Sequence, residues 1–139
     1  MRQQEEHEEQ RALMQWWALY SKSKGLSECL LFAIPNGGFR HISVAMKLKQ
    51  EGVRAGVPDL FLALPCGNYH GLFIEMKKAN GGRVSDSQNA VMTSLVRQGY
   101  SCVVCHGWMA ARLQIERYFA PVAPRSLAPA LPNESEGAK

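Results

Sequence analysis

The chain has 139 residues, of which 46% are hydrophobic and 20% are charged. This length is typical of one domain that buries its own core, and this composition excludes a disordered chain. No run of about 18 apolar residues is present, so the sequence predicts no membrane-spanning helix. The start, MRQQEEHEEQR, is polar and acidic. Because this start is unlike a secretory signal, we expect a cytoplasmic location.

The formal net charge of +4 is unevenly distributed. Residues 1–12 carry four glutamates against two arginines, whereas residues 13–119 carry 12 Lys and Arg against 6 Asp and Glu, a balance of +6. A basic body favours a polyanionic partner such as nucleic acid, although an ordinary solvated surface of this charge is equally compatible.

Apolar spacing and turn residues predict the elements in chain order. They are a helix over 4–22, a strand over 29–34, a helix over 39–52, two strands around VPDLFLALP and LFIEMKK, a helix from Ser85 to about Arg97, a strand over 100–105 and a helix over 107–119. Three- and four-residue spacing predicts the helices, and short apolar runs between turn signals predict the strands.

This alternation predicts an α/β fold with a central mixed β-sheet flanked by helices. The two consecutive strands are expected to pair as a hairpin. From residue 120 onward the chain holds four of its seven prolines and no periodicity. We therefore expect one folded domain over 1–119 and a Pro-rich flexible tail over 120–139.

The motif C-x-x-C in YSCVVC raises a zinc or redox interpretation for Cys102 and Cys105. On a strand, residues three apart point to opposite faces, and no second C-x-x-C completes four ligands. The geometry favours core cysteines.

The segment 56–78, GVPDLFLALPCGNYHGLFIEMKK, holds the residues that can carry chemistry. Asp59 begins one strand and Glu75 lies within the next. Strand alternation places Glu75 and Lys77 on one face, while Ile74 and Met76 point the other way into the core. If the strands pair as a hairpin, the carboxylates of Asp59 and Glu75 converge.

Two converging carboxylates repel each other, and a bound divalent cation neutralises them. Such an ion polarises a phosphate oxygen and lowers the pKa of bound water. Lys77 beside it can orient or deprotonate that water, or offset charge on the transition state. These parts suffice for phosphodiester hydrolysis. The alternative is that Glu75 and Lys77 form an exposed ion pair of little consequence.

The order P-D followed by E-M-K is similar to the PD-(D/E)XK signature of the restriction-endonuclease-like nucleases. The chain resembles the VRR-NUC branch of that superfamily over roughly residues 5–118. The segments that carry this resemblance are MKLKQEGVRAGVPDLFLALP, LFIEMKK and GGRVSDSQNAVMTSLVRQGY. The resemblance implies a single restriction-endonuclease-like domain that cleaves DNA with Mg²⁺ or Mn²⁺. A compact chain of this type suits a bacterium or a phage-infected cell.

The resemblance also implies roles for individual residues. Asp59 and Glu75 would be metal ligands, with the backbone carbonyl of Met76 as a third, and Lys77 would be the catalytic lysine.

Two further residues match the family pattern outside that segment. Glu6, followed by Gln10, fits a family glutamate in the first helix, and Glu9 is the alternative. Gln88 matches a family glutamine near the catalytic lysine. Without the resemblance, the helix glutamates are simple complements of the helix dipole, and Gln88 is a solvent-facing side chain.

The segment IPNGGFR is ordinary turn chemistry or, before a basic helix, a loop whose backbone amides approach DNA phosphate. The candidate DNA contacts are Asn36, Arg40, Lys47, Lys49, Arg54, Lys78 and Arg83.

Stand-alone proteins that resemble this chain act as dimers on branched DNA, which implies a homodimer that cuts four-way (Holliday) junctions, flaps or duplexes. Trp16 and Trp17 are adjacent and cannot share a helix face, so one is expected in the core and the other in a dimer contact. The alternative function is a catalytically silent DNA-binding module that keeps the nuclease fold. The intact Asp59, Glu75 and Lys77 argue against that alternative.

Overall fold

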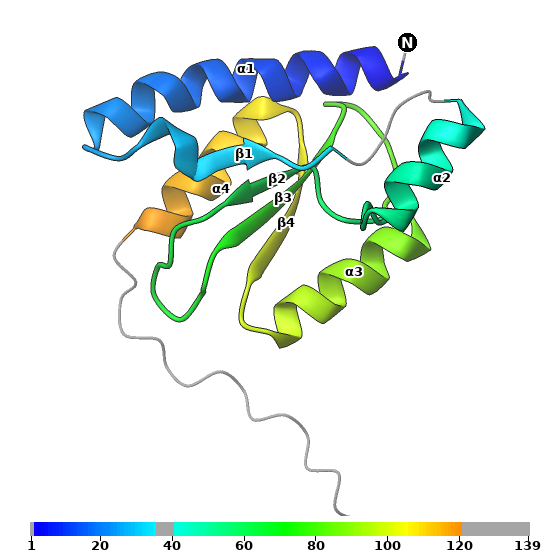
Figure 1. The fold of residues 1–139 in the computed structure, drawn as a ribbon. Helices are drawn as coiled ribbons and strands as arrows, with labels where there is room; N and C mark the ends of the chain where they lie inside the picture. The colour runs from blue at the N-terminus through cyan, green and yellow to red at the C-terminus, as the bar shows by residue number, and fades with distance from the viewer. Residues whose placement is uncertain (1, 36–40, 121–139) are drawn as a thin grey trace, which may run out of the picture.

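The computed structural model describes residues 2–35 and 41–120 (Figure 1). Its helices are α1 (Arg2–Ser23), α2 (Ile42–Gln50), α3 (Asp86–Arg97) and α4 (Trp108–Phe119), with a short 3-10 turn, η1 (Glu28–Leu30). Its strands are β1 (Leu31–Ala33), β2 (Leu60–Leu62), β3 (Leu72–Lys77) and β4 (Ser101–His106). The predicted DNA contacts Asn36 and Arg40, and the predicted tail from residue 121, lie outside the described residues.

The described strands form one mixed sheet in the order β1-β2-β3-β4. The pairs β1–β2 and β2–β3 are antiparallel, and β3–β4 is parallel. The hairpin pairs Leu60 with Ile74, as predicted from the two consecutive apolar runs. The parallel pair requires a crossover, and α3 supplies it, so the predicted α/β fold with a mixed sheet is confirmed.

One face of the sheet carries the core. Ile74 and Met76 point into it, as predicted, and are at most 1% exposed. The other buried apolar side chains of this cluster come from α1, α4 and the four strands: Leu13, Trp17, Leu31, Leu60, Leu62, Leu72, Cys105, Ala111 and Ile115. α1 and α4 also pack against each other over this face (Figure 1).

The adjacent tryptophans of α1 have different surroundings. Trp17 is fully buried, and its Nε1 donates a 2.9 Å hydrogen bond to the carbonyl of Glu28. Trp16 is partly buried, stacks on Tyr20 with ring centroids 4.5 Å apart, and lies 5.7 Å from the guanidinium of Arg112. The expected core position therefore belongs to Trp17, and Trp16 already has partners within its own chain.

Two segments differ from the expected pattern. The apolar run 29–34 was expected to be one buried strand, but it divides into η1 and the short strand β1, where only Leu31 is buried. β1 is an edge strand paired with β2 alone, which leaves Phe32 44% exposed. α2 is shorter than predicted, and none of its residues is buried.

Cys102 and Cys105 are free thiols on β4. Cys105 is buried and Cys102 is partly buried. Burial raises the pKa of Cys102 to about 11 and that of Cys105 to about 12. Both thiols are therefore protonated near neutral pH, which is unsuitable for a metal-binding thiolate. Within the described residues, no helix is both long and apolar enough to cross a membrane.

Candidate active site

Asp59 lies directly before β2, after the buried Pro58. Proline has no N–H to donate, so it is tolerated at the entry to a strand. Asp59 Oδ2 accepts a 2.7 Å hydrogen bond from the backbone N–H of Met76 on β3. This bond brings the Asp59 carboxylate to the β3 backbone between Glu75 and Lys77. The convergence expected from the hairpin is present.

Glu75 and Lys77 share the face of β3 opposite the core, but they are not solvated. Glu75 is 3% exposed and Lys77 is 8% exposed. Lys77 Nζ lies 3.4 Å from Glu75 Oε1. The alternative of an exposed surface ion pair is therefore wrong. Burying two charges has a large desolvation cost, so this pair is poor evidence for stability and a good candidate for function.

Gln88 joins this pair to α3. Its Nε2 donates a 2.7 Å hydrogen bond to Glu75 Oε1, and its Oε1 accepts from Lys77 Nζ at 3.3 Å. The same Oε1 accepts from the backbone N–H of Ser85 at 2.9 Å, while Ser85 Oγ accepts from the Gln88 N–H at 3.2 Å. This reciprocal capping box fixes the first turn of α3. The solvent-facing interpretation of Gln88 is therefore wrong.

Gly56, in the lead-in to Asp59, fixes the other side of the site. Its φ of +87° is strained for residues with a side chain, and a Cβ there would lie 2.5 Å from the backbone oxygen of Ser87. The loop before β2 thus packs directly on the first turn of α3. Asp59 and Gln88 are thereby held by one tight contact between two backbone segments.

The electrostatics of the two carboxylates agree with the geometry. Burial, followed by the neighbouring charge of Asp59, raises the pKa of Glu75 to about 7, against the opposing effect of Lys77. Burial also raises the pKa of Asp59, although the hydrogen bond from Met76 lowers it. Each carboxylate therefore resists ionisation while the other is charged. A bound cation would neutralise this repulsion between the two carboxylates.

One atom of the site is left without a partner. Glu75 Oε2 is buried and has no hydrogen-bond partner within the described residues. Those residues contain no group of three or more His, Cys, Asp or Glu side chains that could hold a metal ion. Mg²⁺, however, is commonly held by one or two carboxylates together with water and substrate phosphate. The pair Asp59 and Glu75, with one buried and unpartnered oxygen on Glu75, fits such an ion.

The glutamates of α1 divide into two kinds. Glu5 and Glu8 are exposed, whereas Glu6 and Glu9 are partly buried. Glu9 Oε2 accepts a 2.6 Å hydrogen bond from the backbone N–H of Trp108. Glu6 is the glutamate whose charge contributes to raising the pKa values of Asp59 and Glu75. Glu9 is thus engaged at α4, whereas Glu6 contributes to the electrostatics of the two carboxylates.

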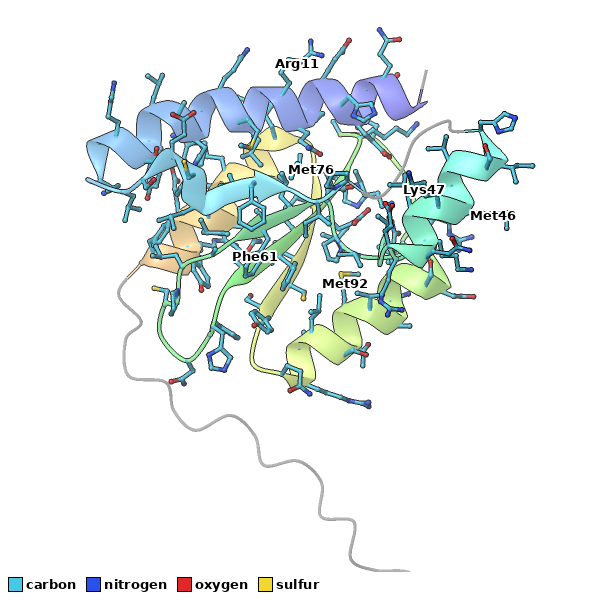
Figure 2. The ribbon with its side chains drawn as sticks, in the orientation of Figure 1. Arg11, Met46, Lys47, Phe61, Met76 and Met92 are labelled. Carbon is cyan, nitrogen blue, oxygen red and sulfur yellow. The ribbon has the colours of Figure 1, made fainter. Side chains whose placement is uncertain are left out.

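The predicted DNA contacts within the described residues are spread over two regions. Lys47 and Lys49 lie on α2 and Arg54 follows it, all three exposed. Figure 2 shows Lys47 and Met46 on different sides of α2. Lys78 is partly buried and Arg83 is exposed. These two lie in the segment that joins Lys77 to α3, directly after the strand that carries Glu75.

Two contacts around Lys77 have no counterpart in the sequence interpretation. A Cβ at Gly82 would lie 3.5 Å from Lys77 Cδ, so the Gly-Gly turn after β3 covers the lysine stem. His106 Nδ1 lies 3.1 Å from the carbonyl of Gly81 and 3.3 Å from that of Lys78. In the sequence, Gly81 and Gly82 indicate only a loop, and no local signal links this loop to His106.

A partly buried carboxylate directly before β2, with a buried carboxylate and a buried lysine on the neighbouring strand β3, is the arrangement expected of a restriction-endonuclease-like nuclease domain. The VRR-NUC domain family matches residues 2–109. A solved structure described as "VRR_NUC domain protein" is 30% identical in sequence and superposes with a TM-score of 0.66. The match covers 81% of this chain and 86% of that chain. No curated protein gave a significant match. The chain belongs to the VRR-NUC domain family, a family of nuclease domains.

Proposed function

We propose that the chain is a divalent-metal-dependent endonuclease that hydrolyses phosphodiester bonds in DNA. The observation that carries this proposal is the carboxylate pair of the partly buried Asp59 and the buried Glu75, beside the buried ammonium of Lys77. Among the described residues, Glu75 Oε2 is buried without a hydrogen-bond partner. Membership in a family of nuclease domains supports DNA as the substrate.

The proposed cofactor is Mg²⁺ or Mn²⁺, held by the side chains of Asp59 and Glu75 and by the backbone carbonyl of Met76. Oxygen donors of this kind suit these hard cations. When bound, the cation supplies charge neutralisation at the phosphate and a lower pKa for water. The raised pKa values of both carboxylates support the assignment, because a cation stabilises their ionised forms.

The chain's own side chains then have distinct roles. Gln88 holds the Glu75 carboxylate through Oε1, which leaves Oε2 without a hydrogen-bond partner among the described residues. The Lys77 ammonium donates hydrogen bonds where negative charge grows on the phosphate oxygens. Hydrolysis adds water across one P–O bond: the water oxygen bonds to phosphorus, and the leaving oxygen takes a proton. The products are a phosphate monoester and a hydroxyl end.

We further propose that branched DNA, as a four-way junction or a flap, is preferred over plain duplex, and that the acting unit is a homodimer. A two-fold dimer would present two sites to two strands with matched symmetry. The exposed basic residues of α2 and of the segment after β3 support contacts to phosphate rather than to base edges.

The experiment is a cleavage assay with the purified protein on single-stranded, duplex, flap and four-way-junction DNA. Each substrate is tested with Mg²⁺, with Mn²⁺ and with chelator. The proposal expects cutting that requires the cation and is lost in Asp59→Ala. The ranking of substrates tests the preference for branched DNA, and sedimentation of the protein–DNA complex tests the dimer.

The second candidate is a catalytically silent DNA-binding module with the same fold. Such a module has no need for the buried charges of Glu75 and Lys77, which have a desolvation cost. Tight binding of all four DNAs without cutting under either cation would favour the silent module and contradict the nuclease.

A further inference from the structure

Glu9 makes a contact that spans the chain. Its Oε2 accepts a 2.6 Å hydrogen bond from the backbone N–H of Trp108, 99 residues away. Trp108 is the first residue of α4, whose first N–H groups have no partner within the helix. The carboxylate of one helix therefore serves as the cap of another.

α4 lacks a cap of its own. Its N-cap is Gly107, which has no side chain and a φ of +85°, and no acidic residue lies in its first turn. A carboxylate at this end of a helix binds free N–H groups and complements the helix dipole. Glu9 on α1 thus supplies the side-chain cap that the residues at the start of α4 do not provide.

The same turn is attached to the end of β3. The backbone N–H of Gly107 donates a 3.0 Å hydrogen bond to the carbonyl of Lys77. The Glu9 carboxylate is thus connected through Trp108 and Gly107 to the backbone of Lys77. Figure 1 shows the N-terminal half of α1 lying over the end of the sheet where α4 begins.

Glu6 precedes Glu9 by three residues, so the two side chains lie on the same face of α1. Both are partly buried, whereas Glu5 and Glu8 are exposed. The charge of Glu6 contributes to raising the pKa values of Asp59 and Glu75, which agrees with a position of Glu6 on the side of α1 that carries Glu9. Anchoring Glu9 therefore fixes how Glu6 approaches the site.

We infer that Glu9 is a positioning residue: its hydrogen bond to Trp108 fixes α1 against the end of β3 and holds Glu6 at the carboxylate pair. The part concerning Glu6 rests on the proposed metal-dependent function. The inference also separates the two glutamates that fit the family pattern. Glu6 acts at the site through its charge, and Glu9 acts chiefly through the hydrogen bond that it accepts from Trp108.

The test compares Glu9→Gln, Glu9→Ala and Glu6→Gln, with Glu8→Gln as the exposed control. Two quantities are measured without DNA: hydrogen exchange of the Trp108 amide in chelator, and affinity for Mn²⁺ by calorimetry. Because the amide oxygen of Gln still accepts from Trp108, Glu9→Gln is expected to stay within about threefold of the wild type in both. Glu9→Ala is expected to accelerate the exchange and to weaken Mn²⁺ binding by about tenfold or more.

Glu6→Gln is expected to weaken Mn²⁺ binding while leaving the Trp108 exchange unchanged. If Glu9→Ala does not fold, Glu9→Asp takes its place, because the shorter side chain withdraws the acceptor but keeps the charge.

Two results would overturn the inference. Equal loss of Mn²⁺ affinity in Glu9→Gln and Glu9→Ala, with Trp108 exchange preserved in Glu9→Gln, would make Glu9 a ligand. Unchanged Mn²⁺ affinity in Glu9→Ala would make the cap purely structural. If the wild type binds no Mn²⁺, the proposed function and the role of Glu6 fail together. The Trp108 exchange would then still report whether the Glu9 cap exists.

Discussion

Gln88 Nε2 donates a 2.7 Å hydrogen bond to Glu75 Oε1, the same oxygen that lies 3.4 Å from Lys77 Nζ. Both donors act on one oxygen of the carboxylate, and Oε2 remains without a partner among the described residues. The orientation of Glu75 on β3 thus depends on the first turn of α3. A capping side chain and the buried carboxylate form one hydrogen-bonded unit.

This unit predicts that Gln88→Ala loses cleavage activity by about 10- to 100-fold, the usual effect of removing a group that orients a metal ligand. The loss follows because Glu75 no longer has a fixed orientation. Rates are measured under single-turnover conditions with saturating Mn²⁺. Asn89→Ala, at an exposed neighbouring position of α3, is the control and should cut at the wild-type rate. Equal rates for Gln88→Ala and Asn89→Ala would refute the orienting role.

Gly56→Ala is predicted to reduce both stability and activity. The new Cβ would lie 2.5 Å from the backbone oxygen of Ser87, so the loop before Asp59 must separate from α3. Gly52→Ala is a matched control, because Gly52 also has a positive φ but a Cβ there meets nothing within 4 Å. The control carries only the conformational penalty, about 1 kcal/mol.

Denaturant unfolding measures both variants. The free energy of unfolding of Gly56→Ala should fall below that of Gly52→Ala by at least about 1 kcal/mol. The close approach would be unimportant if both variants were destabilised equally.

The metal-free protein is predicted to lose stability as the pH rises. The pKa of Glu75 is raised from 4.5 to about 7, so between these values the folded protein holds a proton that the unfolded chain has released. The corresponding contribution to the free energy of unfolding is complete below pH 4.5 and is lost as the pH rises through about 7. Thermal melts in chelator should show a falling Tm over this window.

Glu75→Gln has no such titration, so its Tm should fall less over the same window and should exceed that of the wild type at about pH 8. The control Glu51→Gln, at the exposed C-cap of α2, should follow the wild type. If Tm fell equally with pH in the wild type and in Glu75→Gln, the titration of Glu75 would not be the cause of the pH dependence.

Lys47→Ala/Lys49→Ala is predicted to weaken DNA binding and to reduce its salt dependence. Each lost phosphate contact lowers the slope of log Kd against log salt by about 0.9 for duplex DNA, so the double variant should lose about 1 to 2 units. Fluorescence anisotropy in chelator measures this without cleavage. Lys22→Ala/Lys24→Ala removes the same charge from the far end of α1 and should leave the slope unchanged. Equal slopes for the two double variants would remove α2 from the DNA contacts.

Local signals in the sequence were sufficient for much of the fold. The alternation in LFIEMK predicted which side chains of β3 enter the core, and Ser85 marked the start of α3. The convergence of Asp59 and Glu75 followed from the hairpin alone. Each of these features depends on residues that are close in the chain or on directly paired strands.

Other features had no local signal. The run CLLFAI looks the same for a central strand as for an edge strand, because hydrophobicity does not reveal how many neighbours a strand has. The spacing of apolar residues predicted the helix α2, but it did not predict what packs on that helix. Three glutamates in the first turns of α1 resembled Glu9, and only the contact with Trp108, 99 residues away, distinguishes it.

The most direct test of the central claim is one Mn²⁺ titration of the wild type and Asp59→Asn, with Tm and junction cleavage measured in the same samples. Asn keeps an acceptor for the Met76 N–H but removes the charge. The account predicts that Tm and cleavage of the wild type rise over the same concentration range, and that both responses are lost or shifted to at least about tenfold higher Mn²⁺ in Asp59→Asn. Cleavage by the wild type that persists in chelator, or that is equal in Asp59→Asn, would contradict it.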